Sequence, residues 1–306
     1  IPEKNANECA VINGVTVYSF KSLFEVVQFL KGNIEKKEVK VSYEKYLDKL
    51  NKYTTDFSHE QAEYLVKRAI EIAISGGHNV LMIGPPGAGK SMLAKRILTI
   101  MPDMTLDEAI EVTRVHSVSG LVNNEIVSER PFRNPHSSIS KIGLLGGGTF
   151  PRPGEISLAH RGVLFLDEFP EFSKDAIEGL REPLENGAIT ISRSKQSVTF
   201  PANFILVAAM NPCPCGYYND PTHECRCSIS EIQRYRKKIS GPIMDRIDIH
   251  IDVLPVPVED LQKKKAGENS KEIKERIENV RKIQRLRYKE EQFSENGDIE
   301  DKQLEK

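Results

Sequence analysis

The stretch that decides the fold is Val80-Leu81-Met82-Ile83-Gly84-Pro85-Pro86-Gly87-Ala88-Gly89-Lys90-Ser91, which continues at helical spacing through Leu98. An apolar run of strand length that turns through glycines and prolines into a helix is the context that a phosphate-binding loop requires. Glycines there let successive N–H groups point at phosphate oxygens, at the positive end of the following helix. A glycine-rich turn that binds nothing would not need every fixed position of this pattern. The sequence therefore predicts a nucleotide-binding loop formed by Gly84, Pro85, Pro86, Gly87, Ala88, Gly89, Lys90, Ser91 and Met92.

A second apolar run, 162–166, ends in two acids, Asp167 and Glu168. In nucleotide hydrolases such a strand lies beside the phosphate-loop strand, and its first acid reaches Mg²⁺. We expect Lys90 to contact the β- and γ-phosphates, and Ser91 and Asp167 to hold Mg²⁺. Glu168 is then the general base that polarises the attacking water. The simpler alternative is a pair of acids that merely ends a strand.

A third buried strand is predicted over 204–209, and it places Asn211 at the carboxyl end of a strand, where open parallel sheets bind ligands. Between these strands, 189–192 and 197–200 predict a β-hairpin with a basic tip, Arg193-Ser194-Lys195-Gln196. The fold class predicted is α/β, a parallel sheet flanked by helices with a β-hairpin insert.

The other elements are read from apolar spacing and capping residues. Residues 58–75 and 174–186 predict helices, and Thr105 predicts the N-cap of another. Residues 120–161 show no clear periodicity and predict a long functional loop. Near the N-terminus, alternation over 10–18 predicts two short strands turning at Asn13-Gly14, followed by a helix capped by Ser19 and ending at Gly32.

Composition limits the classes of partner. The 306 residues carry a formal net charge of −1, so any contact with nucleic acid must come from a local patch. No apolar run reaches membrane-spanning length, and the start of the chain lacks an export signal. We therefore expect a cytoplasmic protein with no membrane partner.

Four of the five cysteines lie close together, in the pairs Cys213-Pro214-Cys215 and Cys225-Arg226-Cys227. Such clustering suits a local metal site in a reducing compartment better than a disulfide framework. Four thiolates fit Zn²⁺, although each pair is one residue shorter than the usual spacing. Zinc, free thiols and a disulfide remain alternatives, and His223 is a further candidate ligand.

These residues together resemble the AAA+ ATPases of the magnesium-chelatase-like ComM (YifB) type, over roughly residues 56–255. The shared motifs are Gly76-Gly77-His78-Asn79, the phosphate loop, Arg130-Pro131-Phe132-Arg133, residues 151–162 (PRPGEISLAHRG), Asn211-Pro212-Cys213-Pro214-Cys215-Gly216 and residues 240–248 (SGPIMDRID).

The resemblance implies several roles. Asn211 would be a sensor that orients the lytic water, and Arg246 an arginine finger that completes the ATP site of a neighbouring subunit in a hexameric ring. A local partner of Asp245 or Asp248 is the alternative for Arg246. The loop around Gly146 to Arg152 and the hairpin tip would face the ring pore and contact DNA there, single-stranded or branched, unless they are simply solvated.

The function so implied is an ATP- and Mg²⁺-dependent motor that remodels DNA, a branch-migration helicase of the kind used in natural transformation. The alternative is an ATP-dependent assembly or metal-insertion motor that acts on a protein partner, like the magnesium-chelatase motor subunits. A third reading is a nucleotide switch that does not hydrolyse ATP.

The resemblance also implies a domain organisation. Residues 1–32 resemble the tail of a Lon-protease-like N-terminal domain, 33–55 a linker, and 56–260 the AAA+ core. Helical spacing from Ile273 through Ile283 predicts that a helical lid begins within 261–306. We expect this lid to be truncated before its second-sensor arginine, and residues 1–32 to be the end of something larger.

Overall fold

The structure is a computed structural model that describes residues 1–12, 14–44, 56–59, 64–122, 126–193, 196–220, 222–255, 267–289 and 295–299. The chain divides into two compact units. The first comprises Ile1–Tyr53 with Asp103–Glu129, and the second comprises Thr54–Pro102 with Arg130–Lys306.

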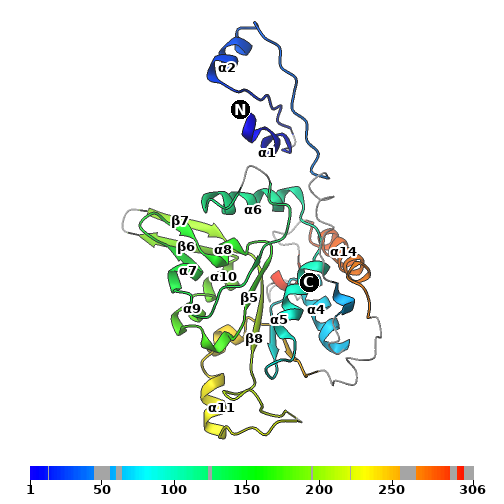
Figure 1. The fold of residues 1–306 in the computed structure, drawn as a ribbon, viewed down its shortest axis with the longest axis vertical. Coiled ribbons are helices and arrows are strands. Elements are labelled where there is room, and N and C mark those ends of the chain that lie inside the picture. The colour runs from blue at the N-terminus through cyan, green and yellow to red at the C-terminus, as the bar shows by residue number, and fades with distance from the viewer. Residues whose placement is uncertain are drawn as a thin grey trace. The chain divides into compact units, whose positions relative to one another are not determined.

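The second unit is built on a five-stranded sheet in the order β2-β5-β8-β1-β9, in which every pairing is parallel (Figure 1). The phosphate-loop strand β1 thus lies inside the sheet, between β8 and β9. The predicted α/β class with a parallel sheet flanked by helices is confirmed. The strands are β1 (Val80–Ile83), β2 (Phe132–Arg133), β5 (Val163–Leu166), β8 (Ile205–Met210) and β9 (Ile249–Asp252).

The strand order corrects one expectation. The strand that ends in Asp167 does not lie beside the phosphate-loop strand, because β8 pairs with both and separates them. Each inner strand is a short apolar run that is buried on both faces, as parallel sheets require. An apolar run of this kind predicts a buried strand, but it does not indicate which other strands pair with it.

Helices cover both faces of this sheet. Alternate strand residues, such as Leu81 and Met82, enter two different apolar clusters. On the Met82 side the cover is η3 (Phe57–His59), α4 (Tyr64–Gly76), α5 (Lys90–Ile100) and α14 (Ser270–Arg287). On the Leu81 side it is α8 (Glu155–Leu158), η4 (Phe169–Glu171), α9 (Lys174–Glu178), α11 (Ile229–Arg236) and α12 (Gly241–Met244).

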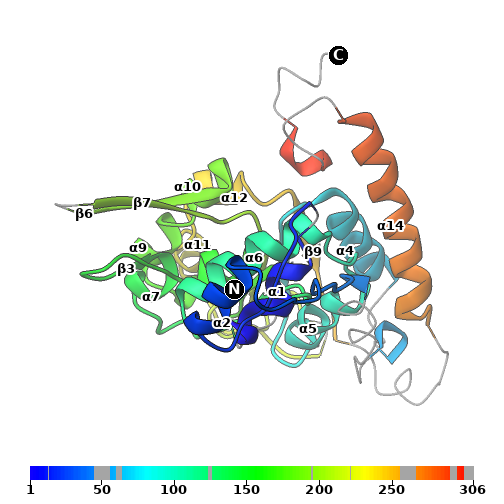
Figure 2. The same ribbon diagram turned by 90° about the horizontal axis from the view of Figure 1, so that it is seen from above.

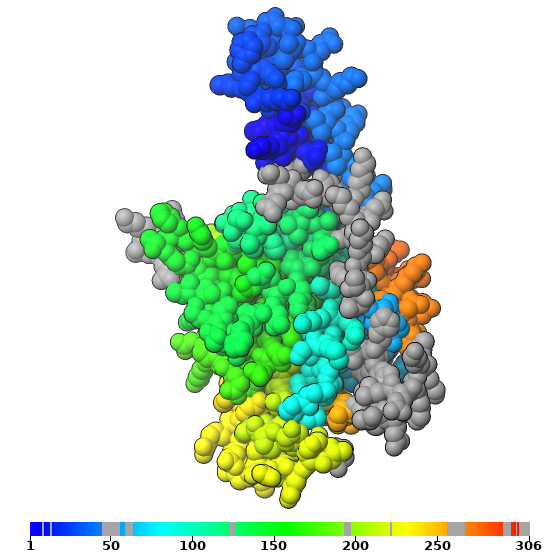
Figure 3. Space-filling view, in the orientation of Figure 1, coloured from blue at the N-terminus to red at the C-terminus, as the bar shows by residue number. Residues whose placement is uncertain are grey.

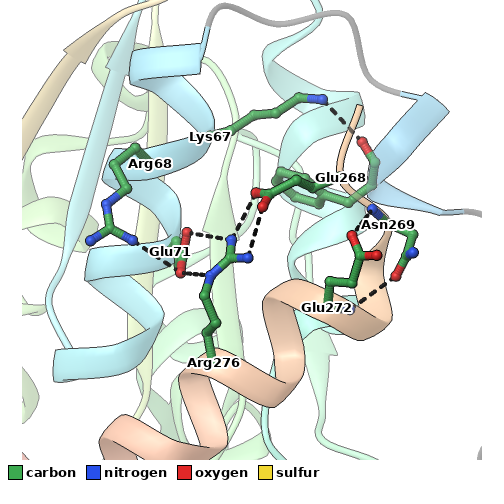
Figure 4. A network of polar contacts seen from close by, with 8 residues as sticks. Lys67, Arg68, Glu71, Glu268, Asn269, Glu272 and Arg276 are labelled. Carbon is green, nitrogen blue, oxygen red and sulfur yellow. Dashed lines mark hydrogen bonds and ion pairs between the residues drawn. The ribbon is translucent and has the colours of Figure 1, made fainter. Parts of the chain in front are cut away.

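The C-terminal helix α14 is held against α4 by charged groups as well as by apolar contacts (Figures 2 and 4). Arg276 donates two hydrogen bonds to Glu71, at 2.8 and 3.2 Å, and two to Glu268, at 2.8 and 2.7 Å. Arg281, which is buried, donates to the Ile74 carbonyl at the end of α4 and pairs with Glu295 before η5 (Asn296–Asp298). The helix predicted from the apolar spacing that starts at Ile273 is therefore present as α14, and its inner face joins the core of this unit.

The segment 120–161 is not structureless, contrary to the sequence prediction. Its described part contains β2, α7 (Lys141–Leu145), and a small antiparallel pair of β3 (Gly146–Gly147) and β4 (Arg152–Pro153) before α8. These elements are too short to produce a periodic pattern. The predicted hairpin insert is present as β6 (Ala188–Arg193) and β7 (Gln196–Pro201), which extends away from the sheet in Figure 2. Ser194 and Lys195 at its tip lie outside the described residues.

The helix predicted over 174–186 is two helices, α9 and α10 (Arg181–Asn186). Pro183 explains the break, because its ring lacks an N–H and would clash with the carbonyl one turn earlier in a continuous helix. In the structure Pro183 occupies the first turn of α10, where a missing N–H is tolerated, and Gly187 ends that helix at φ +61°.

The first unit contains η1 (Glu3–Asn5), α1 (Ala6–Ala10), α2 (Leu23–Leu30) and α6 (Leu106–Val118). The strands predicted over 10–18 were wrong in the described residues, where α1 ends at Ala10 and only Val17 makes a bridge, with Val39. Val11 instead packs against Ala109 and Val112 of α6, a long-range contact that local alternation does not reveal. Ser22, rather than Ser19, caps α2, whereas Thr105 caps α6 as predicted. Among the described helices of both units, none is long and apolar enough to cross a membrane.

Candidate nucleotide-binding site

The phosphate loop leaves the sheet at Gly84, where β1 ends between two neighbours. The Gly84 N–H donates to the Met210 carbonyl of β8 at 3.2 Å. A Cβ atom on Gly84 would lie 2.1 Å from the Val253 carbonyl oxygen, so this position requires glycine. Gly87 and Gly89 adopt φ values of +80° and +87°, and Gly89 is the N-cap of α5. The loop therefore directs its backbone toward the start of a helix, the arrangement that binds phosphate.

Lys90, the first residue of α5, is buried and folds back over the loop. Its Nζ donates to the carbonyls of Gly84 and Pro85, at 2.6 and 2.9 Å, and to Asn211 Oδ1 at 3.3 Å. Burial lowers the pKa of this amine, and the nearby Asp167 carboxylate opposes that effect. These three hydrogen-bond partners are neutral oxygens, so they do not neutralise the charge of the amine. The charged amine can therefore still attract an anion such as phosphate.

Ser91 and Asp167 come together although 76 residues separate them. Ser91 Oγ donates to Asp167 Oδ2 at 2.6 Å. Asp167 directly follows β5, and its other carboxylate oxygen accepts from the Glu168 N–H at 2.9 Å. A hydroxyl beside a carboxylate at a sheet edge offers the hard oxygen ligands that Mg²⁺ prefers, so the residues present fit this ion.

Glu168 has an unusual backbone conformation, with φ +52° and ψ +43° at the start of η4. This left-handed region is uncommon for a residue with a side chain, and such strain is found at functional sites. At this residue the chain turns away from the direction of β5, and Glu168 lines a cavity next to the phosphate loop.

A cavity of about 360 Å³ joins these groups. Gly84 and Pro85 are not among its lining residues, although their carbonyls accept from Lys90, which is among them. The cavity is lined by Pro86, Gly87, Ala88, Gly89, Lys90, Ser91, Met92, Asp167, Glu168, Met210 and Asn211. The structure thus brings together, around one cavity, every predicted nucleotide residue except Gly84, Pro85 and Arg246.

A second cavity of about 420 Å³ shares Glu168 and Asn211 with the first. The sequence did not predict that residues of α11 would line a cavity next to these two. Tyr235 of α11 is buried there, and burial raises the pKa of its hydroxyl to about 12. Lys238 pairs with Glu171 at 2.9 Å across the same cavity. No sequence motif links α11 to Glu168, since this neighbourhood depends on how α11 packs against the sheet.

Arg246 lies outside both cavities. Its Nη2 donates to Glu185 Oε1 at 2.9 Å, and its side chain remains about half exposed, at 47%. Asp248, one partner considered for it, instead accepts from the Asn79 N–H at 3.3 Å. The Asn79 side chain binds the Arg246 carbonyl at 2.9 Å and the Leu206 N–H at 2.8 Å, so Asn79 fixes the backbone at Arg246 to the sheet.

The four clustered cysteines converge beside the nucleotide cavity. The Sγ atom of Cys213 lies 3.4 Å from that of Cys215 and 3.8 Å from that of Cys225, and all four ligand atoms lie within 4.8 Å of one another. All are free thiols, so the disulfide alternative is not what the structure shows. Backbone N–H groups of Tyr217 and Arg226 lower the pKa of Cys215 to about 6. His223 stacks on Tyr217 at 4.6 Å between ring centroids and is not one of the four converging groups.

Comparisons with known proteins identify the family of this chain. Residues 56–261 match the family model described as magnesium chelatase, subunit ChlI. The chain is 45% identical over 291 residues to competence protein ComM of Haemophilus influenzae and 41% identical over 292 residues to YifB of Escherichia coli. Each alignment covers 93% of this chain but only 56% and 55% of the relative, so the chain spans about half the length of the relatives it matches. A magnesium-chelatase 67 kDa subunit of Chlorobaculum parvum is 26% identical over 150 residues, 48% of this chain and 21% of that protein.

The family match covers the whole sheet and every residue that lines the nucleotide cavity, and the alignments to ComM and YifB extend over most of the remaining chain. This chain therefore belongs to the magnesium-chelatase family of AAA+ proteins and is a homologue of ComM and YifB.

Proposed function

We propose that this chain is the motor part of an ATP-hydrolysing ring that remodels DNA. The observation that carries the ATPase proposal is the 2.6 Å contact between Ser91 and Asp167, which joins the phosphate loop to the acid pair at one cavity. Lys90 and Glu168 line the same cavity. The phosphate-binding lysine, the proposed Mg²⁺ ligands and the proposed general base therefore belong to one site.

Each residue then has a separate task. Lys90 and the loop N–H groups bind and orient the phosphates, and Ser91 and Asp167 hold Mg²⁺, which when bound would neutralise charge on the phosphate oxygens. Glu168 accepts the proton of the attacking water as general base. Asn211, which contacts Lys90 and borders both cavities, orients that water.

Arg246 supports the ring. It does not line the cavity of its own chain, and its guanidinium is half exposed at the surface. A guanidinium supplied by a neighbouring subunit to the transferred phosphate raises phosphoryl-transfer rates by about 10³ to 10⁵. We propose that Arg246 serves the ATP site of the next subunit in a hexamer of identical chains.

The DNA part of the proposal is supported by an exposed loop and by the likeness to a competence protein. Phe150, between β3 and β4, is 81% exposed, and Arg152, two residues later at the start of β4, is also exposed. An exposed aromatic ring with a neighbouring cation is the combination that binds single-stranded nucleic acid, by stacking on bases and neutralising phosphate. Of the hairpin tip, the side chain of Arg193 and all of Lys195 lie outside the described residues.

We also propose Zn²⁺ as a second bound metal, held by Cys213, Cys215, Cys225 and Cys227. Tetrahedral thiolates at the usual zinc–sulfur distance of about 2.3 Å lie about 3.8 Å from one another. The separations among Cys213, Cys215 and Cys225, at 3.4, 3.6 and 3.8 Å, are close to that value, and all four Sγ atoms lie within 4.8 Å of one another. Reduced thiols of this kind, and a DNA partner, suit a cytoplasmic protein.

The test is the ATPase activity of the full chain with and without branched DNA. We expect branched DNA to stimulate turnover. Phe150→Ala with Arg152→Ala should weaken DNA binding about tenfold and reduce its salt dependence, while basal turnover is unchanged. Lys174→Ala, an exposed cation on α9, is the control and should change neither. Absence of stimulation, together with a protein that co-purifies and stimulates turnover, would instead favour a motor that acts on a protein, as the magnesium-chelatase alternative holds.

A further inference from the structure

The cysteine segment is attached directly to two parts of the nucleotide site. Only Pro212 separates Cys213 from Asn211, which accepts from Lys90 at 3.3 Å. Directly after the first cysteine pair, Gly216 packs against the phosphate loop. A Cβ atom on Gly216 would lie 2.7 and 2.9 Å from the ring of Pro86, which lines the nucleotide cavity. In Figure 3 the chain around the cysteines and α11, yellow, borders the cyan atoms of the phosphate-loop region.

The turn that makes this contact is tight. Gly216 adopts φ +90°, which favours glycine, and its N–H donates to the Cys213 carbonyl at 3.0 Å. Pro212 fixes a backbone dihedral at the entry to the turn and accepts from Arg236 Nε of α11 at 3.3 Å. These contacts couple the backbone of the turn to the Cys213 and Cys215 thiols that it carries, so a displacement of those thiols would displace Gly216 as well.

The second pair of cysteines lies in a poorly buried segment. The described residues from Tyr217 to Cys227 are all half-buried or exposed, so apolar packing contributes little to their order. The segment then enters α11 through Ser228, which forms a capping box with Glu231. A metal bound by all four thiols would join the end of β8 to the start of α11, and binding free energy at such a site becomes folding free energy.

We infer that the four-thiolate zinc site is a positioning element of the nucleotide site. Bound zinc fixes the 213–216 turn, and that turn holds Pro86 and Asn211 in place around the phosphates. The inference rests on the proposed function in one respect, since the nucleotide must bind at the phosphate loop. None of the four cysteines lines the nucleotide cavity, so they act through Pro86 and Asn211 and not on the substrate.

The experiment measures two properties of the purified full chain, the zinc content and the dissociation constant of a fluorescent ATP analogue in Mg²⁺. We expect about one zinc per chain, and cadmium exchange should give a sulfur-to-metal charge-transfer absorbance. Removal of the metal should weaken nucleotide binding at least about fivefold, and added Zn²⁺ should restore it.

Variants separate the steps. Cys225→Ser, on the less buried side of the cluster, should lower both zinc content and nucleotide affinity. Gly216→Ala should lower nucleotide affinity, because its methyl group would meet the ring of Pro86 and alanine disfavours φ +90°. A zinc content that stays near one per chain in this variant would show that the loss of affinity arises after metal binding. His223→Ala is the matched control in the same segment and should alter neither property. If Cys225→Ser fails to fold, Gly216→Ala and metal removal from the wild-type chain still test the inference.

The failures are distinguishable. A well-folded chain that holds no metal and binds nucleotide at full affinity would overturn the zinc site. A chain with one zinc whose removal leaves nucleotide affinity unchanged would overturn the positioning role alone. A zinc-loaded chain that binds no nucleotide under any condition would overturn the proposed ATPase function, and with it the positioning role, and would leave the metal site standing.

Discussion

Arg246 and Glu185, 61 residues apart, form an ion pair at 2.9 Å, and Glu185 accepts at the same time from Arg181 at 3.0 Å. Hydrogen bonds from Arg181 and then from Arg246 hold the pKa of Glu185 below its usual value. The proposed arginine finger is therefore held by a carboxylate of its own chain, and it must leave that carboxylate to reach a phosphate in a neighbouring subunit.

The first prediction concerns action between subunits. Arg246→Ala and Lys90→Ala should each abolish most ATP turnover. A mixture of the two inactive proteins should recover part of it, because mixed rings contain interfaces with both groups intact. The measurement is steady-state ATPase activity after subunit exchange, and exchange itself is followed by energy transfer between labelled subunits. Exchange without recovered activity would mean that Arg246 acts within its own chain.

The second prediction concerns the pair itself. Glu185→Gln should release Arg246, and because the pair is partly exposed and screened, the effect should be modest. We expect the protein concentration at half-maximal ATPase activity to fall about two- to fivefold. Arg181→Gln is the matched control of opposite sign. It leaves Arg246 as the remaining ion-pair partner of Glu185 among the described residues, so it should raise that concentration. If the protein concentration at half-maximal activity is unchanged in both variants, the ion pair with Glu185 does not restrain Arg246.

The third prediction distinguishes hydrolysis from a nucleotide switch. Glu168→Gln removes the proposed base while keeping the size of the side chain, so turnover should fall about 10²- to 10⁴-fold. ATP affinity should remain within about threefold of the wild type, because Lys90 and the loop N–H groups are untouched. Turnover is measured by phosphate release, and affinity by equilibrium binding. Unchanged turnover in this variant would support the switch.

The fourth prediction concerns the contact between α14 and α4 (Figure 4). Burial would raise the pKa of Glu71, but hydrogen bonds from Arg276 and Arg68 outweigh it and lower the pKa below 4.5. A carboxyl whose folded-state pKa is depressed stabilises the fold above its unfolded pKa, and this contribution is lost as the pH falls through the folded value. Glu71→Gln should therefore lower the free energy of unfolding by about 1–2 kcal/mol at neutral pH, and the difference from wild type should shrink below about pH 4.

Glu275→Gln, on the exposed face of the partner helix α14, is the control for that measurement. It should change the free energy of unfolding by less than about 0.5 kcal/mol at either pH. Urea unfolding at the two pH values checks both variants. A difference for Glu71→Gln that stays constant with pH would contradict the ion-pair explanation.

Local sequence was sufficient for the elements that carry the chemistry. The run from Val80 to Ser91 determined a strand, a glycine-dependent turn and a helix, because each conformation follows from neighbouring residues. Asp167 and Asn211 were recognisable for the same reason, since each follows an apolar run of strand length. Thr105 as a helix cap is a further local signal that the structure bears out.

Tertiary structure decided which of these elements meet. It placed β8 between β5 and β1, so that Asn211 lies between the acid pair and the phosphate loop, and it paired Arg246 with Glu185 rather than with a sequence neighbour. It also brought Gly216 against Pro86, and α11 beside Glu168. The physical reason is that parallel strand pairing and side-chain contacts over many tens of residues depend on how helices pack on both faces of the sheet, and no periodicity within one segment records that packing.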